Sequence, residues 1–272
     1  MNILEKIIAR KQEEITESKK QRSISDLEKE PLFARPTASL AQALRSSTTP
    51  RIISEFKRKS PSKGVINGDV LPQIVTQDYV QAGAVGLSVL TDIDFFGGSF
   101  ADFLAAREAN PHIPMLRKDF MVDEYQLFEA KAIGADVILL IAACLTPAEI
   151  AHLSRRAHDL GLEVLLEVHN AEELAVSTGE HIDIVGVNNR NLKTFETSIE
   201  TSIGLSELIP EQFVKISESG LKDAETIVKL FQYGYKGFLI GETFMKTANP
   251  GAALAGLQQE LTQHSNLNPL VL

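Results

Sequence analysis

Short apolar runs alternate with longer amphipathic stretches along most of the chain. Eight runs rich in Val, Ile and Leu recur, and their starts lie 20 to 33 residues apart. This spacing fits one strand, one helix and two short loops. Apolar runs between helices are typical of parallel strands that are covered on both faces. The runs are residues 52–55, 85–90, 113–116, 137–141, 164–168, 184–187, 214–216 and 238–240.

Eight strand–helix units over residues 51–261 predict the α/β class and, within it, a (β/α)8 TIM barrel. The alternative is an open doubly wound sheet, which typically carries a glycine-rich nucleotide-binding turn after its first strand. Here the first strand is followed by KRKSPSKG, a basic segment without that pattern. The barrel is therefore the favoured fold.

The first 50 residues lie outside these units, and their apolar positions have helical spacing with charges between them. This pattern predicts an amphipathic helix that packs on the barrel. We therefore expect an N-terminal helical extension over residues 1–50, one barrel over residues 51–261, and a C-terminal tail over residues 262–272, which lacks helical periodicity. The apolar positions of the first helix are Ile3, Leu4, Ile7, Ile8 and Ile15.

Composition narrows the possible environments and partners. Lys and Arg number 27 against 36 Asp and Glu, and the net charge of −9 disfavours nonspecific binding to nucleic acid. No apolar run approaches the ~18 residues of a membrane span. One cysteine among 272 residues fits a reducing compartment. We expect a cytoplasmic protein that binds neither nucleic acid nor membrane.

Polar or charged residues end seven of the eight predicted strands. Barrel enzymes place their reactive groups at these carboxyl ends. Glu55 and Lys57 are two residues apart and share a face of the strand, and Asn188 and Arg190 do the same. Glu167 ends an otherwise apolar strand, where a buried acid is costly unless it faces the barrel mouth. The sequence therefore predicts a catalytic mouth.

Two turns and one loop beside this mouth indicate an anionic ligand. The turns after strands seven and eight contain Ser219-Gly220 and Gly241-Glu242, and barrels frequently bind phosphate there. Glycine lets the backbone approach an anion, and N–H groups at a helix start point toward it. The loop after strand one holds four basic residues within 57–63, which favours an anion on a protein of negative net charge.

Metal and nucleotide chemistry have little support in the sequence. The six histidines show no metal-ligand spacing, and Cys144 has no His at a recognisable spacing for nucleophilic catalysis. A supporting role for His169, which follows Glu167, stays open. We expect neither a metal nor an organic cofactor.

Seven ordered segments between about residues 51 and 247 resemble the indole-3-glycerol phosphate synthase family. The N-terminal helix also resembles that family's extension over its barrel. The segments are IISEFKRKSPSKG, LTDIDFFGGS, MLRKDFMVDEYQ, LLEVHN, IVGVNNRNLKTFET, ISESGL and FLIGETFM.

The resemblance implies a lyase of tryptophan biosynthesis. The enzyme would close the indole ring of 1-(2-carboxyphenylamino)-1-deoxyribulose 5-phosphate and release carbon dioxide and water. Lys118 would be the general acid at the ketone oxygen, with Glu167 and Lys57 as the acid–base pair of the dehydration. The resemblance implies catalytic residues Glu55, Lys57, Lys118, Glu167, Asn188 and Arg190, and substrate or phosphate contacts from Ser60, Ser219, Gly220, Gly241 and the backbone of Glu242.

Glu242 departs from relatives that have Ser at this position. Because a carboxylate would repel phosphate, we expect its side chain to turn away from the ligand. We also expect a monomer acting on a small phosphorylated molecule, with association with other tryptophan-pathway enzymes as a further option. The alternatives are another phosphate-binding barrel, such as phosphoribosylanthranilate isomerase or a Schiff-base lyase using Lys118, and a non-catalytic binding barrel.

Overall fold

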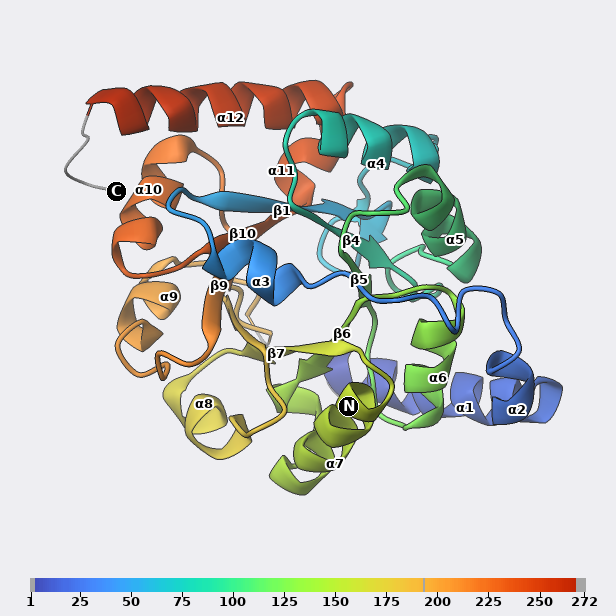
Figure 1. Ribbon diagram of the computed structural model, residues 1–272. Coiled ribbons are helices and arrows are strands. Elements are labelled where there is room, and N and C mark those ends of the chain that lie inside the picture. The colour runs from blue at the N-terminus through green and yellow to red at the C-terminus, as the bar shows by residue number, and fades with distance from the viewer. Residues whose placement is uncertain (1–2, 193, 268–272) are drawn as a thin grey trace.

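The computed structural model describes residues 3–192 and 194–267, and within them eight parallel strands close into a barrel (Figure 1). Each strand pairs with its neighbours in chain order, and β10 closes the barrel on β1. The predicted (β/α)8 barrel is thereby confirmed. Its strands are β1 (Arg51–Phe56), β4 (Gly86–Leu90), β5 (Met115–Lys118), β6 (Val137–Ile141), β7 (Glu163–Val168), β8 (Ile184–Asn188), β9 (Val214–Glu218) and β10 (Gly237–Ile240).

One long helix follows each barrel strand in the described part of the chain, and together these helices form the outer layer (Figure 1). A two-stranded hairpin of β2 (Lys59–Ser60) and β3 (Gly64–Val65) follows β1, and the short helices η1 (Ala142–Cys144) and α11 (Glu242–Met245) follow β6 and β10. The outer helices are α4 (Pro72–Gln81), α5 (Phe100–Ala109), α6 (Tyr125–Ala132), α7 (Pro147–Asp159), α8 (Ala171–Ser177), α9 (Glu200–Leu205), α10 (Ala224–Gln232) and α12 (Pro250–Leu267).

Strand β5 begins and ends two residues later than the sequence predicts. Its last two residues, Arg117 and Lys118, are charged, so hydropathy alone does not mark them as strand. Arg117 is nevertheless buried, because its guanidinium pairs with Asp119 at 3.0 Å and with Glu129 of α6 at 3.3 Å. Lys118, on the opposite face, points into the barrel mouth.

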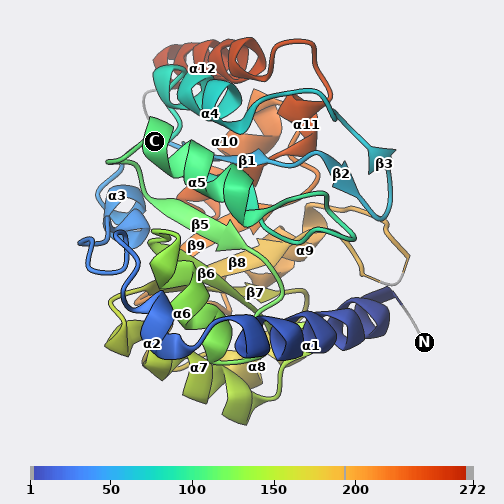
Figure 2. The same cartoon turned by 90° about the vertical axis from the view of Figure 1, so that its right-hand side faces the viewer.

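The N-terminal extension contacts both ends of the barrel, as Figure 2 shows. Its helices are α1 (Ile3–Gln21), α2 (Ile24–Leu27) and α3 (Leu40–Arg45). Leu40 and Leu44 of α3 are fully buried in the barrel core next to Ile53 and Ile216. They close the end of the barrel where the strands begin. The other end of the extension, at the start of α1, lies beside the mouth.

A buried lysine joins α1 to the barrel. Lys11 is 4% exposed, and its Nζ lies 2.9 Å from Asp119 Oδ1 and 3.0 Å from Asp92 Oδ2, with Glu14 at 2.8 Å. Burial opposes the charge of Lys11, but these carboxylates raise its pKa above the ordinary value. The apolar stripe of α1 buries Ile7 and Ile15 on either side of this lysine.

The prediction of a tail without helical structure over residues 262–272 is wrong for residues 262–267. Helix α12 continues to Leu267, and residues 268–272 lie outside the described part of the chain. Leu261 is buried, and the next three residues, Thr262, Gln263 and His264, are exposed. Adding residues to an existing helix costs little, so the helix extends past its apolar pattern. No helix of the described residues is apolar over a length that would cross a membrane.

Replacing Lys11 by Met keeps the aliphatic stem, leaves Asp92 buried without its cation and leaves Asp119 with Arg117 alone. Such a loss typically costs about 3–5 kcal/mol. We expect Lys11→Met to lower the free energy of unfolding by that amount in urea denaturation. The control is Lys19→Met, which removes a half-exposed pair of the same helix with Asp123 and should cost less than about 1 kcal/mol. Equal losses in both variants would contradict the role of the buried network.

Candidate active site

A cavity of about 440 Å³ opens at the carboxyl ends of the barrel strands. Ile3, Leu4 and Ile7 of α1 form part of its wall, so the extension does help to shape the mouth. The structure places every residue of the predicted catalytic and binding sets along this cavity. These are Glu55, Lys57, Ser60, Lys118, Glu167, Asn188, Arg190, Ser219, Gly220, Gly241 and Glu242.

Lys118 lies at the centre of the charged groups. Its Nζ is 2.6 Å from Glu218 Oε2 and 3.3 Å from Glu167 Oε2. Lys57 Nζ lies 2.6 Å from Glu55 Oε1, which forms a second ammonium–carboxylate pair in the same mouth. Although burial opposes its charge, Lys118 has a raised pKa because Glu218, Glu167 and Glu55 surround it. Lys118 therefore enters the site as a cation that can donate a proton.

The two glutamates on Lys118 have opposite protonation tendencies. Burial of Glu167 acts against its charge, but Lys118 and His169 lower its pKa below the usual range. Burial raises the pKa of Glu218 to about 7, against the attraction of Lys118 and together with repulsion from Glu167. Paired carboxyl groups with separated pKa values are typical of acid–base sites. One group is held as a carboxylate, and the other exchanges its proton near neutral pH.

Glu218 is absent from the site predicted from the sequence, although the same signal marks it. It is the last residue of strand β9, Glu167 is the last but one of β7, and both are buried. Its neighbour Ser219 drew attention instead because the turn suggested phosphate. The position of the Glu218 carboxyl group also accounts for the glycine at position 186 of β8. A Cβ at Gly186 would lie 2.4 Å from Glu218 Oε1. Glycine at this position leaves room for the Glu218 carboxyl group.

The turn after β9 has an unusual backbone that a buried polar network supports. Ser219 and Gly220 have φ values of 67° and 74°, in the left-handed region that costs a non-glycine residue about 1–3 kcal/mol. The Asn189 amide donates to the Ser219 carbonyl at 3.1 Å and to Ser217 Oγ at 2.9 Å. Asn189 Oδ1 accepts hydrogen bonds from the backbone and hydroxyl of Ser202. Asn189 is absent from the site predicted from the sequence, and its side chain supports the turn through these hydrogen bonds.

The turn after β10 comes very close to the charged cluster. A Cβ at Gly241 would lie 2.6 Å from Glu55 Oε1 and 3.0 Å from Glu55 Cβ, so only glycine fits beside this glutamate. Helix α11 begins directly after Gly241. The turn after β9 reaches α10 only three residues beyond Gly220, through 221–223.

Arg190 connects three parts of the mouth. It lies two residues beyond the end of β8, its Nη1 donates to Ser62 Oγ at 3.2 Å, and its Nη2 lies 3.3 Å from Glu242 Oε2. The Glu242 carboxylate therefore lies beside Arg190 along the cavity, and its turn away from a bound phosphate stays a prediction. Because Arg190 supplies a cation inside the mouth, the carboxylate remains there as its partner.

Part of the cavity lining is apolar. Phe96, from the loop after β4, and Phe120, after β5, stand with ring centroids 5.9 Å apart. Leu139, Ile141 and Leu239 add aliphatic surface. These five apolar residues are absent from the predicted site, because single Phe and Leu residues in loops and strands give no local signal of a ligand surface.

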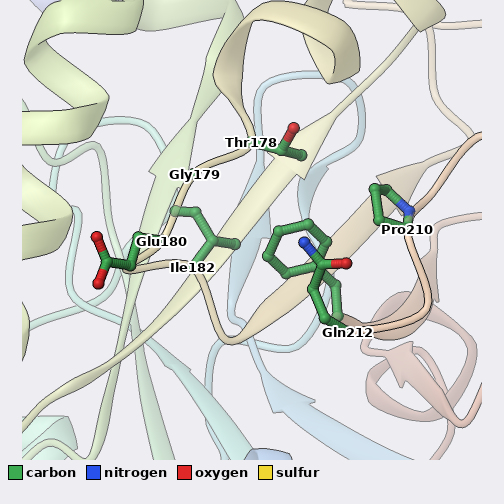
Figure 3. A pocket seen from close by; sticks show the side chains of 7 residues that line it. Thr178, Gly179, Glu180, Ile182, Pro210 and Gln212 are labelled. Carbon is green, nitrogen blue, oxygen red and sulfur yellow. The ribbon is translucent and has the colours of Figure 1, made fainter.

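A second hollow, of about 380 Å³, lies at the other end of the barrel (Figure 3). Its lining comes from the loops before β8 and β9, and among the seven lining residues Glu180 is the ionisable one. This lining lacks the convergent charges of the mouth, so we place the active site at the mouth. Within the described residues, no three His, Cys, Asp or Glu side chains are grouped to hold a metal ion.

Comparison with known proteins agrees with this geometry. The model of the family described as indole-3-glycerol phosphate synthase matches residues 4–257. The protein of that name from Bacteroides thetaiotaomicron is 48% identical over 253 residues, covering 93% of this chain and 96% of the relative. The chain belongs to the indole-3-glycerol phosphate synthase family. The Laribacter hongkongensis member is 43% identical over 260 residues, covering 94% and 98%.

Solved structures outside the family share the fold. The 3-hexulose-6-phosphate synthase of Salmonella typhimurium matches with a TM-score of 0.62 at 13% identity, over 79% of this chain and 99% of that one. The tryptophan synthase alpha subunit of Legionella pneumophila matches with a TM-score of 0.60 at 14% identity, over 84% and 97%. At such identities the likeness concerns the barrel alone. Membership in the indole-3-glycerol phosphate synthase family makes this chain a lyase of tryptophan biosynthesis.

The separated pKa values can be measured directly. In protein with ¹³C-labelled glutamate side chains, we expect one carboxyl resonance to titrate with a midpoint of about 7 and to vanish in Glu218→Gln. In Lys118→Met this midpoint should move upward, because the carboxylate loses its cation. Glu225→Gln, on the outer helix α10, is the control and should leave the resonance in place. Titration of every glutamate near about 4.3 would contradict the separation.

Proposed function

We propose that this chain converts 1-(2-carboxyphenylamino)-1-deoxyribulose 5-phosphate into indole-3-glycerol phosphate, carbon dioxide and water. The observation that supports this most is the partly buried Lys118, which lies between Glu167 and Glu218 in a cavity lined by aromatic side chains and by the two glycine turns. A substrate with an aromatic ring at one end and a phosphate at the other matches this layout. Its ketone carbon would then lie near the lysine.

The phosphate would bind at the turns after β9 and β10. Ser219 and Gly220 would provide one side, Gly241 and the backbone N–H of Glu242 the other. Backbone N–H groups and helix starts are suited to anions. Arg190 and Ser60 would close the site from the β8 and β1 loops. The phosphate would then replace Glu242 as the partner of Arg190, which relieves the repulsion between the two anions.

Ring closure forms a bond between the ring carbon that bears the carboxylate and the ketone carbon. The electron pair of the carbonyl bond moves to oxygen, and Lys118 would donate a proton to that oxygen. The carboxylate then leaves as carbon dioxide, and its bonding electrons restore the aromatic ring. A cationic lysine is suited to this step, since it stabilises the negative charge that develops on oxygen.

Dehydration removes the resulting hydroxyl as water. The hydroxyl takes a proton from an acid, and a base removes the proton that must leave for the indole double bond to form. Glu167, held as a carboxylate, would be the base, and Lys57 the acid. Glu55 lies 2.6 Å from Lys57 Nζ and would orient it, while Asn188 supports Glu167. Glu218, which exchanges its proton near neutral pH, would restore the proton of Lys118 between turnovers.

The Schiff-base alternative has less support. A lysine that attacks a carbonyl must first lose its proton, and such lysines have lowered pKa values. The pKa of Lys118 is raised by its three carboxylate neighbours.

We also propose that the enzyme acts as a cytoplasmic monomer on a small phosphorylated substrate. Association with other enzymes of tryptophan biosynthesis is a further option.

The reaction itself has a direct assay. Purified protein incubated with the carboxyphenylamino substrate should produce indole fluorescence and one equivalent of carbon dioxide, without added metal or cofactor. Absence of product, or borohydride trapping of substrate on Lys118, would contradict the proposal.

Two variants separate chemistry from binding. Lys118→Met keeps the stem and removes the acid, so kcat should fall by ~10²–10⁴-fold. Ser219→Ala removes a contact to the unreacting phosphate, so KM should rise on the order of tenfold with a much smaller change in kcat. Steady-state kinetics of both variants decide the matter. A near-normal kcat in Lys118→Met would end its assignment as the general acid and make Lys57 the leading candidate.

A further inference from the structure

A histidine outside the proposed catalytic set contacts its base. His169 follows Glu167 by two residues at the end of β7, and its side chain is 9% exposed. Its Nε2 lies 3.3 Å from Glu167 Oε1, on the oxygen that Lys118 does not contact. The other ring nitrogen, Nδ1, lies 3.2 Å from Glu173 Oε2. Both nitrogens of the ring therefore face carboxylates.

The first turn of α8 fixes this ring. Glu173 Oε2 also accepts a hydrogen bond from the backbone N–H of His169 at 2.7 Å, and its Oε1 accepts one from the Asn170 side chain at 2.7 Å. Asn170 is itself the N-cap of α8 and accepts from the backbone N–H of Glu173. The imidazole is thus held between the catalytic mouth and a capped helix start, with little freedom to turn.

The contacts require a charged ring. A neutral imidazole has one N–H, so its other nitrogen would point a lone pair at a carboxylate. An imidazolium has two N–H groups and presents positive charge to both neighbours, with Nδ1 within hydrogen-bond distance of Glu173 and Nε2 in a 3.3 Å ion pair with Glu167. Burial opposes the charge, but Glu167 and Glu173 raise the pKa of His169 to about 10. Lys118 of β5 contacts the other oxygen of Glu167 at 3.3 Å, and the Cys144 thiol of η1 lies in the field of both Glu167 and Glu173.

We propose that His169 is a positioning residue that holds Glu167 as an oriented carboxylate for proton transfer. Lys118 contacts one oxygen of the Glu167 carboxylate and His169 the other, and these two cations limit how the carboxylate can turn. Glu173 acts one step further back, since it fixes the imidazole. This inference rests on the proposed function only for the step that Glu167 performs.

Two substitutions distinguish positioning from structural support. His169→Leu removes the contact with Glu167, and we expect kcat to fall by about 10–100-fold with KM nearly unchanged, as for one lost hydrogen bond to a charged group. His169→Gln places a neutral N–H donor on the same carboxylate and should recover at least about tenfold of that loss. The control is His158→Gln, which alters a histidine paired with Asp183 on the outer surface at 2.8 Å and should leave kcat unchanged.

Melting temperatures of the same variants test the structural alternative. If both His169 variants lose stability equally and have equal kcat, positioning is overturned. The charge of the ring has an activity-independent test in the wild-type protein. ¹⁵N-labelled histidine spectra should show His169 protonated on both nitrogens up to at least pH 8, whereas titration near about 6.5 would overturn the charged clamp. A wild-type protein without synthase activity would refute the proposed function and leave this spectroscopic test standing.

Discussion

The mouth of this barrel depends on the partly buried Lys118 ammonium, which lies among three glutamates. An ammonium group removed from water is stable only where carboxylates compensate it, and closely spaced carboxylates are stable only around a cation. Lys118, Glu167 and Glu218 satisfy each other in this way, and the Lys57–Glu55 pair lies beside them. The same compensation gives the groups distinct proton affinities, which is what a sequence of proton transfers requires.

The barrel supplies this cluster because parallel strands bring their carboxyl ends to one edge. The reactive groups come from β1, β5, β7, β8 and β9, which are far apart in the sequence. The extension contributes to both ends of the molecule (Figure 2). Helix α3 closes the end of the barrel where the strands begin, with Leu40 and Leu44. Helix α1 forms part of the wall of the mouth and is anchored by Lys11. A truncation that removes α3 with α1 therefore changes the core as well as the active site.

Local patterns were sufficient to predict the strands and most of the mouth, because a charged residue at the end of an apolar run is visible in one dimension. Contacts between residues far apart in the sequence could not be predicted from local patterns. Lys11 has an ordinary place in an amphipathic helix, and only the tertiary structure brings Asp92 and Asp119 to it. Phe96 and Phe120 meet in the same way. The end of α12 was misplaced because its last described side chains are exposed and leave no apolar pattern.

The claim that Lys118 and Glu218 act as one unit has a direct test in a double-mutant cycle on kcat/KM. The cycle uses Lys118→Met, Glu218→Gln and the double variant, all with the carboxyphenylamino substrate. If the pair acts together, the double variant loses little more activity than the worse single variant, since either change already breaks the unit. Additive losses, with a coupling below about 0.5 kcal/mol, would show two independent residues and contradict the account.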